Sequence, residues 1–259
     1  MESIMKPNTR FSIIVAVRNG ARLLERLLDS LEGQTYGEWE ALVQDGGSTD
    51  GTLDILTRRR DERIKVVSGP DGGVYDAWNK ALDRASGAWI QFLGADDALP
   101  DPYVLARAAR ALAELPDSAT FAQGGLALGR GGKPREILAR SRAEVFRFFV
   151  SGMPLLTPAC FFRKTLFAGP GERFNADYRI AGDFAFVAAR LRPNDLALLP
   201  FVTAYMEAGG LSSAVRTRPL LDAERKRALT EIVLPRAADI VRACIETYGD
   251  TANPLNRRV

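Results

Sequence analysis

Three groups of acidic residues, each accompanied by glycine, follow stretches that have the composition of β-strands. The groups are Asp45 after residues 39–44, Asp71 after residues 64–68, and Asp96 and Asp97 after residues 89–93. Such carboxylates bind ribose hydroxyls or coordinate a hard divalent cation through oxygen. The expected ligand that joins a ribose to a cation is a nucleoside diphosphate, whose phosphates carboxylates alone would repel. A Mg²⁺ or Mn²⁺ ion that bridges the carboxylates and the phosphates would remove this repulsion. Each group alone is more typical of a turn, but three at successive strand ends favour a binding site.

The sequence of 259 residues contains no histidine and two cysteines, Cys160 and Cys244. The lack of histidine excludes Ser-His-Asp and Cys-His catalysis, the common zinc sites and histidine general bases. Two cysteines far apart in the sequence do not indicate a disulfide framework and are typical of buried apolar side chains in a reducing compartment. Acid–base chemistry must therefore come from carboxylates, lysine, tyrosine or cysteine.

The composition is that of an ordinary globular protein with one large core. Hydrophobic residues make up 46% and charged residues 26% of the chain, and no run reaches the roughly 18 apolar residues of a membrane-spanning helix. The N-terminus also lacks the pattern of a secretory signal, so we expect a cytoplasmic protein. The net charge of +3 comes entirely from residues 214–259, which hold nine Lys/Arg and six Asp/Glu. Because no element combines dense basic residues with exposed aromatics, we expect no nucleic-acid partner.

Strand-like stretches alternate with helical periodicity through the first half of the chain. Residues 11–17, FSIIVAV, form a β-branched run that is typical of a strand buried on both faces. Further strands are expected at 39–44, 64–68 and 89–93, with helices between them. This alternation predicts an α/β fold with a parallel sheet and helices on both faces. Ligands of such sheets lie beyond the carboxyl ends of the strands, where the acidic groups fall.

The helix expected from residue 74 has two faces of different character. Apolar residues recur at helical spacing on one face, which is predicted to be core: Val74, Ala77, Trp78, Ala81, Leu82 and Ala85. The other face has the composition of a solvated helix surface: Tyr75, Asp76, Asn79 and Lys80. This helix is therefore expected to cover the sheet beside the acidic groups.

These motifs resemble those of glycosyltransferase family 2, whose members share the GT-A fold. The matching segments, in family order, are SIIVAVRNG (12–20), QTYGEWEALVQDGGSTDGT (34–52), SGPDGGVYDAWNKAL (68–82), GAWIQFLGADDALPDPYVL (87–105), YRIAGDFAF (178–186) and AYMEAGGLSS (204–213). The resemblance implies a Rossmann-like nucleotide-binding fold with a mainly parallel central sheet flanked by helices and an irregular C-terminal half. It implies a single domain over 1–259, with a nucleotide-sugar-binding half at 11–115, an acceptor-side half at 116–213 and C-terminal helices at 214–259.

The resemblance also assigns roles to individual residues. The residues that it implies for nucleotide-sugar binding are Ala16, Arg18, Asp45, Asp71, Asn79 and Asp96. Asp97, the last acid of a DXD-type motif, would coordinate Mn²⁺ or Mg²⁺. Asp183 would be the base that activates the acceptor hydroxyl, although an Asp before a helix expected at 184–191 is also a routine N-cap.

The function implied is a metal-dependent, inverting transfer of a sugar from a nucleoside diphosphate sugar to an acceptor hydroxyl, with UDP as the expected nucleotide. By family analogy the acceptor is a saccharide or a lipid-linked molecule of a bacterial surface polysaccharide or glycolipid. Two alternatives stay open: a non-catalytic nucleotide-sugar-binding protein and a sugar nucleotidyltransferase. The latter should carry a glycine-rich basic loop after the first strand, and residues 18–22 match it poorly. A dinucleotide-dependent oxidoreductase is excluded because Gly-x-Gly-x-x-Gly is missing there.

Two C-terminal features allow more than one interpretation. Gly209 and Gly210, followed by Leu211 to Ser213, form either a loop over the donor or a turn. The helices after residue 214 carry both leucines and basic residues. They either pack on their own domain or associate peripherally with the inner face of the cell membrane through anionic lipids.

Overall fold

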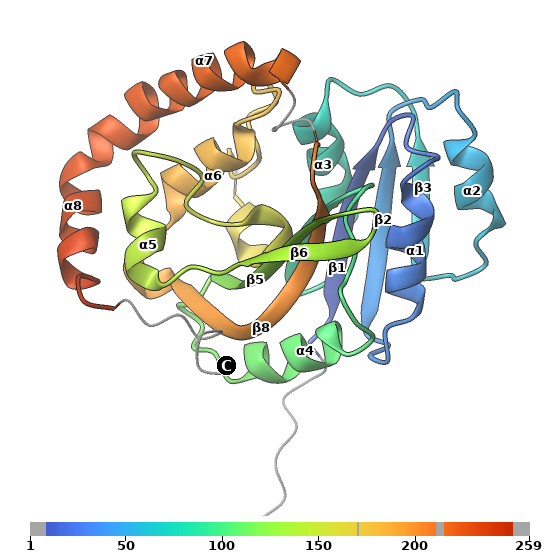
Figure 1. The fold of residues 1–259 in the computed structure, drawn as a ribbon, viewed down its shortest axis with the longest axis horizontal. Coiled ribbons are helices and arrows are strands. Elements are labelled where there is room, and N and C mark those ends of the chain that lie inside the picture. Colours follow the sequence, from blue (N-terminus) through green and yellow to red (C-terminus); the bar gives the residue numbers. More distant parts are fainter. Residues whose placement is uncertain (1–8, 170, 211–214, 251–259) are drawn as a thin grey trace, which may run out of the picture.

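The computed structural model describes residues 9–169, 171–210 and 215–250, and in it helices flank an eight-stranded mixed sheet (Figure 1). The elements of the first half are β1 (Phe11–Val17), α1 (Leu24–Glu32), β2 (Trp39–Asp45), α2 (Thr52–Arg58), β3 (Ile64–Ser68), α3 (Val74–Leu82), β4 (Trp89–Gly94) and α4 (Val104–Ala113). Those of the second half are β5 (Phe121–Arg130), β6 (Lys133–Leu138), α5 (Arg142–Arg147), β7 (Cys160–Arg163), α6 (Gly182–Arg190), β8 (Leu196–Glu207), α7 (Arg218–Ala228) and α8 (Ala237–Glu246). The segment 211–213, which the sequence analysis considered as a donor loop, lies outside the described residues.

The sheet joins a parallel half to a mixed half. Its strand order is β3-β2-β1-β4-β7-β5-β6, and β8 pairs with β5. Strands β1 to β4 are parallel wherever they pair, β7 is antiparallel to both β4 and β5, and β8 is parallel to β5. The predicted α/β fold with a mainly parallel central sheet is therefore confirmed. The carboxyl ends of β1, β2 and β4 lie at one edge of the sheet, because these strands run in the same direction.

Both faces of β1, β2 and β4 are buried, whereas the edge strand β3 is partly exposed. On β1, Ile14 joins the core beneath α3 and α6, whereas Ile13 and Val15 join the core beneath α1 and α4. The apolar run of β1 from Ile13 to Val17 follows from this arrangement, since a strand covered on one face alone would alternate apolar and polar residues. Figure 1 places α1 to α3 at one end of the molecule and α5 to α8 at the other.

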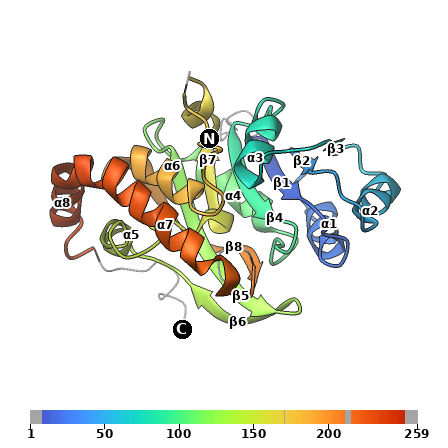
Figure 2. The same ribbon diagram turned by 90° about the horizontal axis from the view of Figure 1, so that it is seen from above.

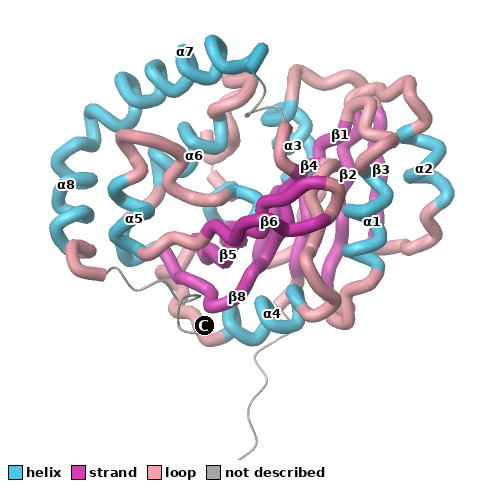
Figure 3. The backbone as a smooth tube through the Cα atoms, in the orientation of Figure 1, coloured by secondary structure: helices cyan, strands magenta, loops and turns pink. Residues whose placement is uncertain are grey.

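The second half of the chain closes over the first through strands and helices of its own. Strands β5, β6 and β8 run between the parallel strands and the helices α5 to α8 (Figure 3). Helix α6 packs against α7, and the two lie side by side in Figures 1 and 2. Ile240 and Ala243 of α8 are buried in the same core as α6, so the inner face of the C-terminal helices packs on the domain. Within the described ranges, no helix has the length and hydropathy needed to cross a bilayer.

Candidate active site

An acidic cleft lies beyond the carboxyl ends of β1 and β4 and consists of two adjoining hollows. The first, with room for about 460 Å³, is lined by Ala16, Val17, Arg18, Asn19, Gly20, Leu23, Asp71, Gly72, Gly73, Val74, Ala77, Ala95, Asp96 and Arg179. The second, about 350 Å³, is lined by Val74, Tyr75, Trp78, Gly94, Asp96, Asp97, Leu128, Arg179, Ile180, Asp183, Met206, Glu207, Ala208, Gly209 and Gly210. Val74, Asp96 and Arg179 line both hollows, so the two form one cleft.

The cleft brings together most of the site residues expected from the sequence. Ala16, Arg18, Asp71 and Asp96 line the first hollow. Asp96 also lines the second hollow, as do Asp97 and Asp183. Asp183 comes from a segment more than 80 residues beyond these other acids, and the fold brings it to the same hollow as Asp96 and Asp97. Asp45 and Asn79 are not among the residues that line the cleft.

Asp45 is buried at the end of β2 and uses its carboxylate to order the loop that follows. It accepts hydrogen bonds from the backbone N–H groups of Gly47 and Ser48 (both 3.1 Å to Oδ2) and from the Ser68 hydroxyl (2.6 Å). Burial raises the pKa of Asp45, but these hydrogen bonds to the charged form outweigh it, and the net pKa lies below the ordinary value. Asp45 thus supports the loop beside Asp71, since a Cβ on Gly46 would lie 2.5 Å from Asp71 Oδ2.

Asn79 is held by the protein backbone. Its amide nitrogen donates to the Phe174 carbonyl oxygen (2.8 Å) and its amide oxygen accepts from the Phe174 N–H (3.0 Å). This pair of hydrogen bonds occupies both ends of the side chain. Asn79 therefore joins α3 to the segment before α6, and its expected contact with the nucleotide sugar stays a prediction.

Asp97 is a buried carboxylate with one unpaired oxygen. Its Oδ2 accepts from the Gly94 N–H (2.7 Å), whereas Oδ1 is buried without a hydrogen-bond partner among the described residues. Burial, together with the nearby charge of Asp96, raises the pKa of Asp97 to about 8. An unpaired buried oxygen of this kind is costly unless it meets a cation or a proton. The geometry is thus suited to a cation placed between Asp96 and Asp97.

An ion pair holds the loop that carries the two acids. Arg26 of α1 bonds the Asp96 carbonyl oxygen and lies 2.7 Å from the Glu207 carboxylate at the end of β8. Glu207 also accepts hydrogen bonds from Tyr205 (3.0 Å) and from the Gly131 N–H (2.6 Å) in the β5–β6 turn. The sequence analysis did not single out Arg26 or Glu207. A helical arginine and a strand-end glutamate look like ordinary surface charges until the fold joins them.

Asp183 lies inside the first turn of α6, so the N-cap interpretation of the sequence is wrong. The helix begins at Gly182, and Ala181 occupies the N-cap position. Asp183 Oδ1 accepts from the Phe184 N–H (2.9 Å) and Oδ2 accepts from the Thr157 hydroxyl (2.9 Å). Burial of the carboxyl group raises the pKa of Asp183, and these hydrogen bonds limit the rise.

Tyr75 contradicts the expectation of a solvated surface on α3. Its side chain is buried, and its hydroxyl donates to the Ile180 carbonyl oxygen (2.6 Å) and lies 3.1 Å from Asp183 Oδ1. Gly182 permits this approach, because a Cβ there would lie 2.7 Å from the Tyr75 ring. A tyrosine often combines a buried ring with a hydrogen-bonded hydroxyl. The burial of Tyr75 was not predicted because its neighbours on the same helix face are polar.

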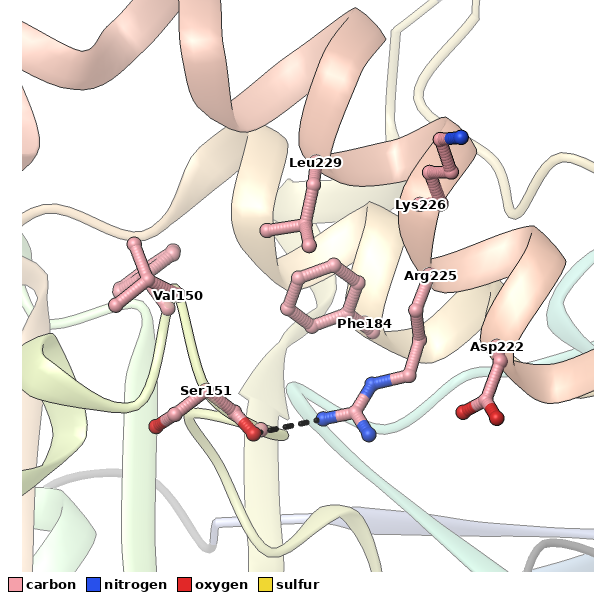
Figure 4. Close-up of a pocket in the computed structure, with 9 residues that line it drawn as sticks. Val150, Ser151, Phe184, Asp222, Arg225, Lys226 and Leu229 are labelled. Carbon is pink, nitrogen blue, oxygen red and sulfur yellow. Dashed lines mark hydrogen bonds between the residues drawn. The ribbon is translucent and has the colours of Figure 1, made fainter. Parts of the chain in front are cut away.

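A separate hollow of about 220 Å³ lies beside α7 (Figure 4). Its apolar wall is formed by Phe149, Val150, Phe184 and Leu229, and its polar rim by Ser151, Asp222, Arg225 and Lys226. Arg225 donates to the Ser151 carbonyl oxygen (3.4 Å) across the hollow. Phe184 directly follows Asp183 in α6, so this helix contributes one residue to this hollow and one to the second hollow of the cleft.

The contact between Gly182 and Tyr75 predicts that Gly182→Ala destabilises the protein by about 1–3 kcal/mol, as overpacking of a buried ring typically does. The ring cannot swing aside as an exposed side chain would. Urea denaturation measures the change. Gly37→Ala is the matched control, because a Cβ at Gly37 meets nothing within 4 Å. Equal stabilities of the two variants would contradict the close packing described here.

Comparison with known proteins identifies the family of this fold and cleft. The profile described as "Glycosyl transferase family 2" matches residues 12–165. A "PGL/p-HBAD biosynthesis glycosyltransferase" of Mycobacterium bovis (strain BCG / Pasteur 1173P2) is 34% identical over 226 residues, which cover 82% of each chain. A "Putative teichuronic acid biosynthesis glycosyltransferase TuaG" of Bacillus subtilis (strain 168) is 40% identical over 89 residues, 33% of this chain and 35% of that one.

Solved structures share the fold at low sequence identity. S. aureus TarS 1-349 in complex with UDP-GlcNAc has a TM-score of 0.66 and 21% identity, covering 88% of this chain and 73% of that chain. The mannosyltransferase PcManGT from Pyrobaculum calidifontis, in complex with GDP-Man and Mn2+, has a TM-score of 0.56 and 20% identity, covering 98% of this chain and 82% of that chain. The family profile and the mycobacterial relative together show that the chain is a glycosyltransferase and belongs to glycosyl transferase family 2.

Proposed function

We propose that this glycosyltransferase is metal-dependent, takes its sugar from a nucleoside diphosphate and inverts the anomeric centre. The observation that carries the proposal is the placement of two chemically different acids in one cleft. Asp97 has a buried unpaired oxygen, and Asp183 has a raised pKa. The first suits a cation and the second suits a general base.

The residues of the cleft fit a divalent cation that shares its ligands with the donor. Within the described part of the chain, no three His, Cys, Asp or Glu side chains form a metal-binding group. Mg²⁺, however, is commonly held by one or two carboxylates together with substrate phosphates. Asp96 and Asp97 would be these carboxylates for Mg²⁺ or Mn²⁺. The neighbour PcManGT was solved with GDP-Man and Mn2+, which supports the proposal without identifying the ion used here.

In the proposed mechanism Asp183 accepts the proton of the acceptor hydroxyl as that oxygen attacks the anomeric carbon. Thr157 and the Phe184 N–H hold the carboxylate of Asp183 in place. A bound divalent cation supplies neutralisation of the charge that develops on the departing diphosphate. Because the acceptor would enter from the Asp183 side and the diphosphate would leave on the Asp96 side, one displacement inverts the configuration.

For the donor we propose a UDP-sugar, since the structural neighbour TarS was solved with UDP-GlcNAc. For the acceptor we propose a saccharide or a lipid-linked molecule of surface polysaccharide or glycolipid synthesis. The names of the relatives, which refer to PGL/p-HBAD and to teichuronic acid biosynthesis, support this class. The apolar wall and basic rim of the hollow in Figure 4 also suit an amphipathic acceptor. A non-catalytic sugar-nucleotide-binding protein would differ by showing no turnover.

We also propose that the outer face of the C-terminal helices contacts the inner face of the membrane. Large apolar side chains are exposed along it, namely Leu220, Leu234, Val241, Ile245 and Tyr248. Exposed basic residues of the same segment are Arg218, Lys226, Arg227 and Arg242, whereas Arg225 and Arg236 donate to backbone carbonyl oxygens of the domain. Apolar side chains beside basic ones are the combination that binds anionic lipid surfaces.

Metal-linked donor binding is expected to depend on Asp97. With the natural chain, UDP plus Mn²⁺ should raise the melting temperature more than either does alone. Loss of a residue that only hydrogen-bonds a metal ligand typically lowers metal affinity roughly 10–100-fold. Asp97→Asn, which removes a proposed ligand itself, should weaken UDP binding in Mn²⁺ by more than this. Asp83→Asn, which changes an exposed acid paired with Arg173, is the control. Equal UDP affinity with Mn²⁺ and with EDTA would refute metal dependence.

Asp183→Asn is expected to lower sugar transfer by about 10²–10⁴-fold, the usual contribution of a general base. Because the pKa of Asp183 is raised, the natural chain should lose activity as the pH falls through that pKa, where the base becomes protonated. Initial rates of UDP release between pH 5 and 9 measure both effects. A variant with near-normal turnover, or a flat profile at low pH, rules out Asp183 as the base.

Membrane contact is checked by flotation with phosphatidylserine vesicles at low salt. The natural chain should float. The double variant Leu234→Asp and Ile245→Asp should remain in solution, because it replaces two exposed apolar side chains of the proposed lipid-contacting surface with charged ones. Binding should weaken at high salt as the basic residues are screened. Failure of the natural chain to float at low salt refutes the proposal.

A further inference from the structure

A buried carboxylate on α7 holds the segment that leads into α6. Glu224 is 8% exposed, and its carboxylate accepts hydrogen bonds from three consecutive backbone N–H groups: Arg179 (2.6 Å), Ile180 (2.9 Å) and Ala181 (2.8 Å). No ion pair of Glu224 occurs among the described residues. The three donors therefore satisfy the buried charge, which would otherwise be costly.

The same short segment is tied down from its other side by α3. The Tyr75 hydroxyl donates to the Ile180 carbonyl oxygen (2.6 Å). Restraints from α7 and α3 thus act on residues 179–181 in opposite directions. Asp183 follows two residues later, in the first turn of α6, so its position depends on where this segment lies.

The side chain of Arg179 reaches the donor part of the cleft. It lines both hollows, and its Nη1 donates to the Gly72 carbonyl oxygen in the loop after β3. Gly73 has φ +125°, which disfavours any side chain, and a Cβ there would lie 3.1 Å from Arg179 Nη1. The loop is therefore shaped to admit the guanidinium group.

Arg179 is one of two basic side chains among the charged residues that line the cleft. The acids are Asp71, Asp96, Asp97, Asp183 and Glu207, and the cations are Arg18 and Arg179. Glu207 is neutralised by Arg26, but the remaining acids still outnumber the cations. Arg179 has no carboxylate partner among the described residues and faces both hollows. A diphosphate is an anion that a guanidinium group binds through paired hydrogen bonds.

We propose that Arg179 binds the diphosphate of the donor and that Glu224 is the positioning residue that holds both Arg179 and Asp183 in register. The inference rests on the proposed nucleoside diphosphate donor. It joins α7, which lies beyond the residues matched by the family profile, to the cleft. The charge of Glu224 is essential, because a glutamine at this position accepts through one oxygen only and turns an NH₂ group toward the backbone donors.

The test compares UDP with uridine, because uridine lacks the diphosphate. Affinities for both are measured by calorimetry in Mn²⁺. Arg179→Gln should weaken UDP binding by about 10-fold or more, as expected for a lost charge-assisted pair, and leave uridine unchanged. Glu224→Gln should weaken UDP more than uridine and also lower the turnover of a UDP-sugar.

Glu231→Gln is the matched control, since Glu231 is an exposed acid just beyond α7 that pairs with Arg227. It should leave both affinities and turnover unchanged. Circular dichroism and melting temperature confirm that each variant is folded, and the exposed Arg179 can be changed without disturbing the core.

Two outcomes overturn the inference while leaving the proposed function intact. The first is unchanged UDP affinity in Arg179→Gln, and the second is an equal loss of UDP and uridine in a folded Glu224→Gln, which would give Glu224 a purely structural role. If the natural chain binds none of UDP, GDP or ADP, the proposed function itself fails and the inference fails with it.

Discussion

Carboxylates withdrawn from water at the edge of the sheet are the constraint on which the rest of the structure depends. A buried carboxylate is stable only if hydrogen-bond donors, a cation or a proton meet it. The protein satisfies this requirement differently at each position. Asp45 and Glu224 are surrounded by N–H and O–H donors, whereas Asp97 keeps one oxygen without a partner in the described chain. Asp45 and Glu224 thereby support loops around the cleft, whereas the open oxygen of Asp97 is the feature on which the proposed cation site rests.

Hydrogen bonds and an ion pair hold the elements around the cleft in place. Arg26 and Glu207 join α1, the loop of Asp96 and the end of β8. Helices α3 and α7 do the same for the segment before α6 through Tyr75 and Glu224. Tyr75 and Glu207 thus both line the cleft and hold its wall in place.

The two halves of the chain contribute in unequal ways. The parallel half supplies the acidic groups through strand ends, a placement that follows from the direction of the strands. The second half supplies Arg179 from a loop, Asp183 from helix α6 and Glu207 from the end of strand β8. Their placement depends on contacts that span long stretches of sequence. Tyr75 and Ile180, for instance, are 105 residues apart. A substitution in α7 can therefore affect the cleft although α7 does not line it.

The sequence by itself determined the α/β order, the parallel strands and the acids at their ends. These features are local, because apolar periodicity defines each element and strand direction brings the carboxyl ends to one edge. Its motifs also placed Asp96, Asp97 and Asp183 in one site. It did not reveal that Tyr75 is buried, that Asn79 is held by Phe174, or that Asp183 lies inside α6. Only the tertiary structure decided these, along with the contacts of Arg26, Arg179 and Glu224. Whether a polar side chain meets water, backbone or another charge depends on neighbours that are distant in the sequence, and no local pattern encodes them.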